Sequence, residues 1–533
     1  MNNLQYNDWR NGSFALLLGV LLTLSACAQG PDPLRWQVDE QLYRQAYGVL
    51  ASEHLLYPID QKDWPVKIDQ TRQLFLDDYL LASIENIRRK VNPAKKHAAN
   101  PLIDRDRPWE GFGPTFHTVL RDEKTGKFRM WYSAYHNYVL PSGVTVRSPM
   151  CYAESNDGIT WHKPDIGLYE YDGSKANNIV IPKGAAYAIF DEPPDREPDR
   201  RRRFKAIVWH DWTDPQGAPP EGYYLYTSHD GIHWTQARQR PLALNQNRHQ
   251  PGIGDTSLFF WDPRLERYVS YTKILFRNPT MRSSGMMESD DLIHWSRPRM
   301  TIYPDGLDDQ DTQIYAHCGF VHESMWMGLV RVMHTDLIEA SRKQTVVQLT
   351  ASRDGRHWTR VGQREVLIPL GAADEWDPHY HAPTSKPILV GDEHWIYYFS
   401  MPLWDPQVVG EDVAMEKKIA RIGLAKLRRD GFVSLDAGDE TGRVVTRPLT
   451  FEGSQLFVNV KVGPGGYLKA AFADLAGKPL GGYDTLACKP VTGDRLSAPI
   501  AWMSQERIEC TNDESLRLIF ELKNAKLYSF WIE

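Results

Sequence analysis

The sequence has no excess of basic residues, few cysteines and almost no helical periodicity. Its 62 Lys and Arg against 68 Asp and Glu give a net charge of −6 over 533 residues. Phosphate backbones require a strongly basic face, so nucleic acid is not expected as the main partner. The five cysteines show no CxxC spacing, which argues against a zinc site, although Cys488 and Cys510 are close enough in sequence to form a disulfide in an oxidising compartment.

The only long apolar run, residues 14–24, is too short for a permanent transmembrane helix. It leads into Leu24-Ser25-Ala26-Cys27, which resembles the lipobox of a bacterial lipoprotein. We therefore expect a signal peptide over residues 1–27 and a lipid anchor on Cys27. Ala28 after the cysteine favours the outer membrane, on the periplasmic or cell-surface side. An unlipidated secretory signal is the alternative, and in both cases the chain is exported.

A short box of the form Ser-x-Asp-Gly-x-x-Trp recurs along the chain. Four copies and a degenerate fifth are found, at Ser155–Trp161, Ser228–Trp234, Ser289–Trp295, Ser352–Trp358 and Arg429–Phe432. Ser and Asp side chains bind nearby backbone amides, and Gly supplies the positive φ of a tight turn, so each box predicts a hairpin. The aspartates of the boxes are 61 to 76 residues apart, a repeat typical of propeller blades.

The boxes therefore predict an all-β fold, a five-bladed β-propeller over residues 95–440. Residues 28–94 form a lead-in segment, in which Gln73–Leu76 is expected to be a strand entering blade one. After Thr441 the boxes stop and alternating apolar strands separated by Gly-rich turns follow. This change of pattern predicts a C-terminal β-sandwich over residues 441–533.

A propeller followed by a sandwich resembles glycoside hydrolase family 32 and, more broadly, the clan that links it with family 43. Ser289–Trp295 is similar to the Ser-x-Asp-Leu-x-x-Trp hairpin common in those enzymes. The resemblance implies three carboxylates at the starts of the innermost strands of blades one to three. The chain lacks the family 32 signature Trp-Met-Asn-Asp-Pro-Asn-Gly, as well as Arg-Asp-Pro and Glu-Cys, so the resemblance does not imply fructan substrates.

Five carboxylates lie near the expected strand starts: Glu110, Asp191, Asp255, Asp311 and Asp377. Glycoside cleavage needs an acid for the leaving oxygen and a carboxylate at or behind the anomeric carbon. We assign Asp255 as general acid, Glu110 as nucleophile or base and Asp191 as orienting group. At least two of the five are expected to face each other about 5–10 Å apart. Alternatively, Glu110 caps a turn and Asp191 pairs with the neighbouring Arg-rich loop.

Aromatic and imidazole side chains near the same strand starts are candidates for substrate binding. They are Trp109, His117, His379 and His381. No cofactor is expected, and no metal site is predicted because no ligand spacing is present. The run Arg200–Arg203 is either a solvated loop or a clamp for sulfate or uronate groups, because guanidinium pairs bidentately with oxyanions.

Together these features predict a glycoside hydrolase that acts on extracellular or periplasmic poly- or oligosaccharide and is expected to be exo-acting, in the sense of trimming chain ends. One alternative is a non-catalytic carbohydrate-binding lipoprotein. The other is a propeller enzyme of different chemistry, namely a sialidase-like hydrolase, a lyase or a phosphorylase.

Overall fold

The computed structural model describes residues 65–135, 137–139, 145–210, 221–244, 253–277, 280–335, 344–403, 415–505, 507–508 and 515–533. Cys27 and Cys510 lie outside these residues. The described residues form β-strands and three short 3-10 helices but no α-helix, which confirms the prediction of an all-β chain. Within the described part of the chain, no helix has the length and apolar character needed to cross a membrane.

Three antiparallel meanders follow one another from residue 114 to residue 302. Unit one contains β6 (Pro114–Arg121), β7 (Phe128–Ala134), β10 (Met150–Ser155) and β11 (Ile179–Ile181). Unit two contains β12 (Ala185–Asp191), β13 (Phe204–His210), β14 (Gly222–Ser228), β15 (Trp234–Gln236) and β16 (Ala243–Leu244). Unit three contains β17 (Ser257–Asp262), β18 (Arg267–Arg277), β19 (Thr280–Ser289) and β20 (Arg299–Ile302). A short hairpin of β8 (Asn137–Val139) and β9 (Thr145–Arg147) is inserted in unit one.

The next two meanders share one sheet. Unit four contains β21 (Thr312–His322), β22 (Met325–His334), β23 (Gln344–Ser352) and β24 (Thr359–Arg360). Unit five contains β25 (Tyr380–Ala382), β26 (Ile388–Val390), β27 (Glu393–Met401) and β28 (Arg421–Arg428). Its edge is completed by β5 (Lys95–Lys96), which pairs antiparallel to β28 although more than 300 residues separate them in the sequence.

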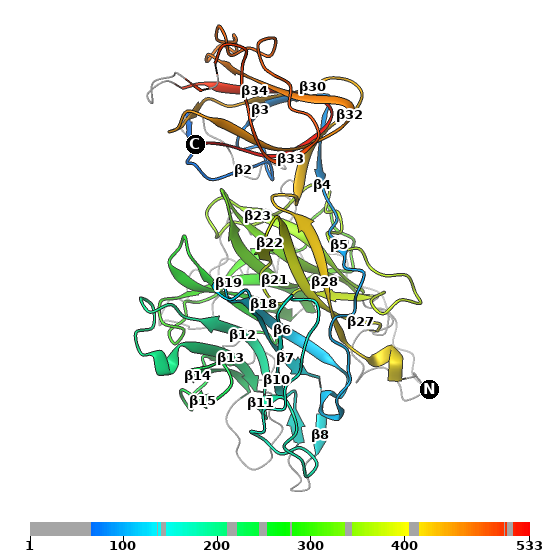
Figure 1. Cartoon of the computed structure of the whole chain (residues 1–533). Helices are drawn as coiled ribbons and strands as arrows, with labels where there is room; N and C mark the ends of the chain where they lie inside the picture. The colour runs from blue at the N-terminus through cyan, green and yellow to red at the C-terminus, as the bar shows by residue number, and fades with distance from the viewer. Residues whose placement is uncertain are drawn as a thin grey trace, which may run out of the picture. The chain divides into compact units, whose positions relative to one another are not determined.

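The first strands of the units meet around a common centre. Strand β12 packs against β6 and β17, and β17 packs against β21, whereas unit five contacts β6 through β27, its third strand. Figure 1 shows these strands together in the part of the chain coloured cyan to yellow. Successive antiparallel meanders with their first strands gathered in this way give a propeller-like arrangement.

A further sheet is built from both ends of the chain. Its N-terminal strands are β2 (Gln73–Leu74), β3 (Leu81–Glu85) and β4 (Ile87–Val91), and its later strands are β29 (Val433–Ala437), β30 (Gly442–Thr446), β32 (Leu456–Ala473), β33 (Asp494–Pro499) and β34 (Arg517–Ile532). Two short strands, β1 (Val66–Lys67) and β31 (Leu449–Thr450), pair in parallel. The expectation that Gln73–Leu76 leads into unit one is wrong, because β2 pairs with β34. The lead-in therefore belongs to this sheet, which already includes residue 433.

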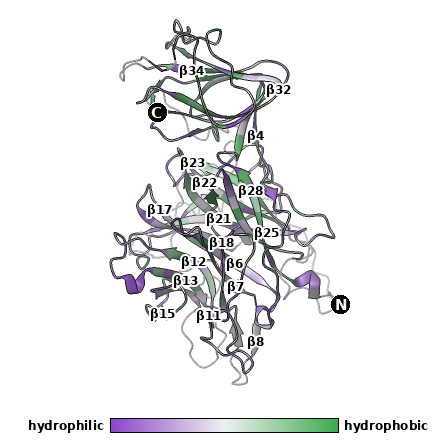
Figure 2. Ribbon diagram, viewed as in Figure 1, coloured by the Kyte–Doolittle hydropathy of each residue, from purple (hydrophilic) through white to green (hydrophobic). Residues whose placement is uncertain are grey.

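The four complete boxes form the predicted turns. In the second box, Ser228 Oγ accepts from the amides of Asp230 and Gly231, and Asp230 Oδ1 accepts from the next two amides. Neighbouring units dock on these turns: Trp131 of β7 donates to the carbonyl oxygen of Gly231 at 2.6 Å. The degenerate fifth copy differs, because Asp430 accepts from Asn459 and Ser529 instead. Figure 2 shows hydrophobic residues on strands such as β22 and β28, where they supply the buried cores.

Candidate active site

Three of the first strands carry a β-bulge near their start, and each extra residue is aromatic. The ladder between β6 and β7 skips Phe116, that between β12 and β13 skips Tyr187, and that between β21 and β22 skips Tyr315. A bulge breaks the strict alternation of side chains and redirects the extra residue. The same irregularity therefore presents an aromatic ring in units one, two and four.

These rings meet one another and two aromatic residues of unit five. Phe116 lies 4.4 Å from Tyr187 and 5.4 Å from Phe399, measured between ring centroids. Phe399 lies 5.5 Å from Tyr380, and Tyr380 lies 6.4 Å from Tyr315. A chain of aromatic contacts thus joins four of the five units at their centre.

Unit three contributes a charged pair to the same place. Asp255 precedes β17, and its Oδ1 accepts a hydrogen bond from Lys273 Nζ of β18. The Asp255 side chain is 46% exposed, whereas that of Lys273 is only 5% exposed. Lys273 Nζ lies 4.8 Å from the centroid of the Tyr315 ring. Solvent therefore reaches the carboxylate while its partner ammonium stays covered.

Two arginines complete this group. Arg331 of β22 is fully buried, donates through Nη1 to the Tyr380 hydroxyl at 2.9 Å and has its guanidinium carbon 5.2 Å from the Tyr315 ring. Arg282 of β19 donates to Gln313, and its guanidinium carbon lies 5.9 Å from the same ring. We call Asp255, Lys273, Arg282, Tyr315, Arg331 and Tyr380 the central cluster.

The charges of the central cluster shift the pKa values of Asp255 and Tyr315. Burial alone would raise the pKa of Asp255, but Lys273 and then Arg282 outweigh it, so the pKa of this carboxyl falls below its usual range. Burial, followed by the charge of Asp255, raises the pKa of Tyr315 to about 12. An ionised carboxylate suits a base or a nucleophile, so the direction of this shift argues against Asp255 as the general acid predicted from the sequence.

Glu110 occupies the strand start expected for unit one but is enclosed by partners. It is fully buried and accepts from Lys163 Nζ and from the Tyr132 hydroxyl, each at 2.6 Å. Its other oxygen accepts from the amides of Asp106 and Arg107. This arrangement corresponds to the alternative in which Glu110 caps a turn, here in the 3-10 helix Pro108–Glu110.

Asp191 does not lie at a strand start. It is the last residue of β12, and both its oxygens accept from Arg203 at 2.6 Å. The expectation of an inward-facing carboxylate there is wrong, because β12 begins six residues earlier. The Arg-rich run pairs within its own loop, since Arg201 binds Asp199 and Arg200 binds the carbonyl oxygen of Glu192. Pairing of Asp191 with this loop, the alternative weighed from the sequence, is what the structure shows.

Asp377 and Asp311 lie before the first strands of units five and four, as expected. Asp377 is fully buried and accepts from Lys96 at 2.9 Å and from the Tyr398 hydroxyl at 2.9 Å. Asp311 is partly exposed, and its Oδ1 lies 3.4 Å from His334 Nδ1. Among the described residues, no hydrogen bond joins any two of the five predicted carboxylates.

The predicted substrate-binding residues are mostly covered. His117 is buried beside Thr384, and burial lowers its pKa to about 4. His381 is fully buried against Asp377, and Trp109 donates to Asn178 at 2.8 Å. His379 is partly buried, and its carbonyl oxygen accepts from the amide of Thr345. His117 lies close enough to Arg331 for the two charges to interact, and His379 and His381 flank Tyr380 in the sequence, so a role of these residues in substrate binding stays a prediction.

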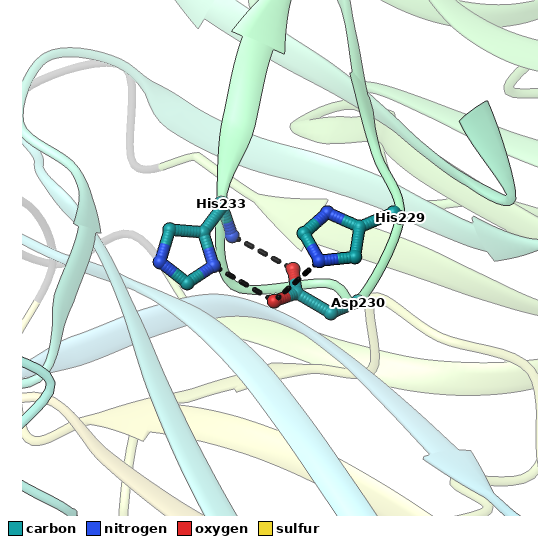
Figure 3. Close-up of side chains that lie close together, drawn as sticks. All are labelled: His229, Asp230 and His233. Atoms are coloured by element: carbon teal, nitrogen blue, oxygen red, sulfur yellow. Dashed lines mark hydrogen bonds and ion pairs between the residues drawn. The ribbon is translucent and has the colours of Figure 1, made fainter. Parts of the chain in front are cut away.

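Three groups of His and Asp could hold a metal ion by proximity: His229, Asp230 and His233; His322, His394 and Asp430; and Asp309, Asp311 and His334. The first is a turn feature, shown in Figure 3, because its bond from His233 to Asp230 recurs between His294 and Asp291 and between His357 and Asp354. In the second group, Asp430 is saturated by protein donors. The donor sets of these two groups therefore do not point to a resident metal.

Two surface recesses of about 540 and 610 Å³ lie elsewhere. The first is lined in part by Lys95 and Lys96, and the second by Glu288 and Arg356, which pair with each other. Neither contains a residue of the central cluster. We place the candidate site at the central cluster because elements from several units supply its charged and aromatic groups there.

Sequence reasoning found Asp255 but missed Lys273, Arg282 and Arg331. A usable signal was present, because Lys273 and Arg331 interrupt apolar strands, as in Leu329-Val330-Arg331-Val332. A charge inside such a strand is costly unless it has a function or a partner.

No family model matches the chain, and no curated protein matches it. Solved structures give weak likenesses. An N-acetylgalactosamine deacetylase from F. plautii, in complex with blood group B trisaccharide, is 16% identical over 64% of this chain and 96% of its own, with a TM-score of 0.40. A glycoside hydrolase family 43 arabinoxylan arabinofuranohydrolase from Bacillus subtilis is 9% identical over 82% and 99%, with a TM-score of 0.36. A β-1,2-mannobiose phosphorylase from Listeria innocua is 12% identical over 63% and 97%, with a TM-score of 0.40. TM-scores this low carry no argument, so the fold rests on the strand pairing itself.

Proposed function

We propose that this chain is a glycoside hydrolase whose active site is the central cluster, on a five-bladed β-propeller followed by a β-sandwich. One observation carries the proposal. The half-exposed carboxylate of Asp255 lies where bulged aromatic residues from several units meet. Aromatic rings stack on the apolar faces of pyranose sugars, and a few polar groups among them fix the orientation of a ligand.

Asp255 is assigned the role of base or nucleophile. Lys273 keeps it ionised, so it can activate water behind the anomeric carbon or attack that carbon itself. A second group must then protonate the leaving oxygen. Asp311 is the candidate for this role, because it is partly exposed and lies two residues before Gln313, the partner of Arg282.

The test compares Asp255→Asn with Asp191→Asn on aryl glycosides and on plant, marine and host polysaccharides. We expect Asp255→Asn to lower the rate by about 10²–10⁴-fold, because a positioned acid or base contributes that much. Asp191→Asn is the matched control, since its carboxylate binds Arg203 at the opposite end of a first strand. Thermal melts establish that both variants fold. Full activity of Asp255→Asn would refute the assignment.

A second candidate function is non-catalytic carbohydrate binding. It is favoured by the ion pairs of Glu110, Asp191 and Asp377 with Lys163, Arg203 and Lys96, which engage three of the five candidate carboxylates. The same panel separates the two functions, because a binding protein retains glycans without releasing product. In that case Asp255→Asn changes affinity alone.

We further propose that the chain is exported and anchored to the outer membrane through a lipid on Cys27. The support is the sequence Leu24-Ser25-Ala26-Cys27 after an apolar run. This placement would bring the site into contact with extracellular or periplasmic glycans.

A further inference from the structure

We propose that the central cluster binds an oxyanion carried by the glycan, so that the substrate is an acidic sugar bearing a carboxylate or a sulfate ester. This inference rests on the proposed function, because it names the substrate class of the same site. It places anion recognition on Arg331 and Arg282 rather than on Arg200–Arg203, where the sequence suggested a clamp.

The central cluster holds more positive than negative charge. Lys273, Arg282 and Arg331 lie with their charged groups 4.8, 5.9 and 5.2 Å from the Tyr315 ring. Asp255 is the only carboxylate that binds any of the three among the described residues. Like charges gathered in a covered place repel one another at considerable cost. A bound anion would relieve this repulsion.

The proposal rests mainly on Arg331, whose charge is paired with no carboxylate in the part of the chain that the structure describes. This arginine is fully buried, and no ion pair joins it to a described carboxylate. Its Nη1 donates to Tyr380, but Nε and Nη2 have no hydrogen-bond partner in the described part of the chain. Leaving two donors of a buried charged group unpaired is strongly unfavourable, which distinguishes Arg331 from an ordinary core arginine.

Three other covered arginines are paired with carboxylates. Arg360 binds Asp308, and Arg72 binds Asp430 at 2.9 Å. Arg353 binds Asp77 through Nε and Nη2 at 2.8 and 2.7 Å. The edge of the guanidinium that holds the carboxylate of Asp77 is therefore the same edge that is unpaired in Arg331. Two parallel N–H groups on this edge match the geometry of a carboxylate or sulfate.

The Arg331 edge is itself covered, whereas other members of the central cluster are in contact with solvent. Asp255 is 46% exposed, and Tyr315 and Arg282 are only partly buried. Arg282 Nε is a further buried donor without a partner among the described residues. Tyr315 lies between the cations and offers a face on which a sugar ring can stack. A charged sugar would thus satisfy the arginines with its oxyanion and the aromatic residues with its ring.

The experiment measures binding by titration calorimetry, which does not depend on turnover. D-Galacturonate and D-glucuronate are compared with D-galactose and D-glucose, and with a sulfated galactose, inorganic sulfate and inorganic phosphate. We expect an acidic sugar to bind about tenfold or more tightly than its neutral counterpart, because charge-assisted bidentate bonds are strong. Arg331→Gln and, at a less buried position, Arg282→Gln should each reduce this preference.

The control is Arg356→Gln, which removes an arginine of the surface pair with Glu288 and should leave the preference unchanged. If Arg331→Gln fails to fold, Arg282→Gln still tests the proposal. Equal affinity for acidic and neutral sugars overturns it. Binding of inorganic phosphate without any acidic sugar supports an oxyanion site but overturns the glycan as its source. Failure of the hydrolase proposal would instead appear in the separate panel of aryl glycosides and polysaccharides, as binding of a glycan without release of product.

Discussion

Replacement of Lys163 by Met tests whether Glu110 is structural or catalytic. The Lys163 side chain is 7% exposed, and its Nζ lies 2.6 Å from the fully buried Glu110. Removing one partner of a buried ion pair costs about 3–5 kcal/mol, because the other charge stays buried without compensation. The Tyr132 hydroxyl and two amides still bind Glu110, so we expect the lower end, about 3 kcal/mol.

The assay is equilibrium unfolding in urea, with Glu110→Gln and the double variant measured alongside. Glu110→Gln should cost less, because Lys163 keeps its bonds to Asp106 and to the carbonyl oxygen of Asp104. The double variant should be more stable than Lys163→Met alone, since it buries no unpaired carboxylate. Wild-type stability for Lys163→Met, together with a loss of activity of about 100-fold or more, would show that Glu110 belongs to the chemistry instead.

Two further predictions concern stability. Gly231→Ala should destabilise the fold by about 2–4 kcal/mol, because φ is +82° and an added Cβ would lie 2.7 Å from the Trp131 ring. The control is Gly391→Ala, which has φ +59° and open space around it and should cost only about 1 kcal/mol. Equal melting temperatures for the two variants would contradict the packing argument. Burial lowers the pKa of His117 to about 4 and that of His317 to about 3, so the unfolded state binds more protons and stability falls as the pH drops from 6.5 toward 4. His317→Gln should flatten this slope by up to about 1.4 kcal/mol per pH unit in urea titrations, and an unchanged slope would mean that His317 is charged in the folded state.

The turns were predictable because their interactions are local. In each complete box, the Ser and Asp side chains bind amides two or three residues away, so all the residues that form the turn lie within the box. One copy shows that the backbone requirement is stronger than the residue preference. Leu292 takes φ +65° where the other boxes have Gly, and its side chain is fully buried. Burial of the leucine side chain offsets the conformational cost of a positive φ at a residue other than glycine.

Strand pairing over long distances was not predictable from local patterns. Gln73–Leu74 has the composition of a strand, but nothing nearby in the sequence indicates that its partner is Ser529–Phe530. Asp191 was misplaced for a different reason, because the signal was local. The apolar run Ala185–Phe190 precedes Asp191, so this residue ends a strand, whereas Asp191-Glu192-Pro193 had been interpreted as the start of a unit.

The strand starts of units one and five contain carboxylates for a structural reason. Glu110 binds Lys163, and Asp377 binds Lys96 from the N-terminal strand that completes unit five. Both carboxylates are fully buried, so they hold segments together that are distant in the sequence. A search for acidic residues at strand starts cannot separate such ion pairs from catalytic groups. The two are distinguished by how far the carboxylate is buried and by which residues bind it, and the sequence shows neither.

The central cluster depends on bulges, and a bulge is a property of two paired strands rather than of one. In a regular strand, Thr115, Phe116 and His117 would alternate between the two faces of the sheet. Phe116 is skipped in the ladder, which interrupts this alternation, and the same happens at Tyr187 and Tyr315. The aromatic residue leaves the ladder at the point where the first strands converge. A carboxylate placed beside these rings needs a cation to remain ionised, and Lys273 of the second strand supplies it. Arg331, also on a second strand, binds no carboxylate of the described residues, and its unpaired edge is the basis of the anion site proposed above.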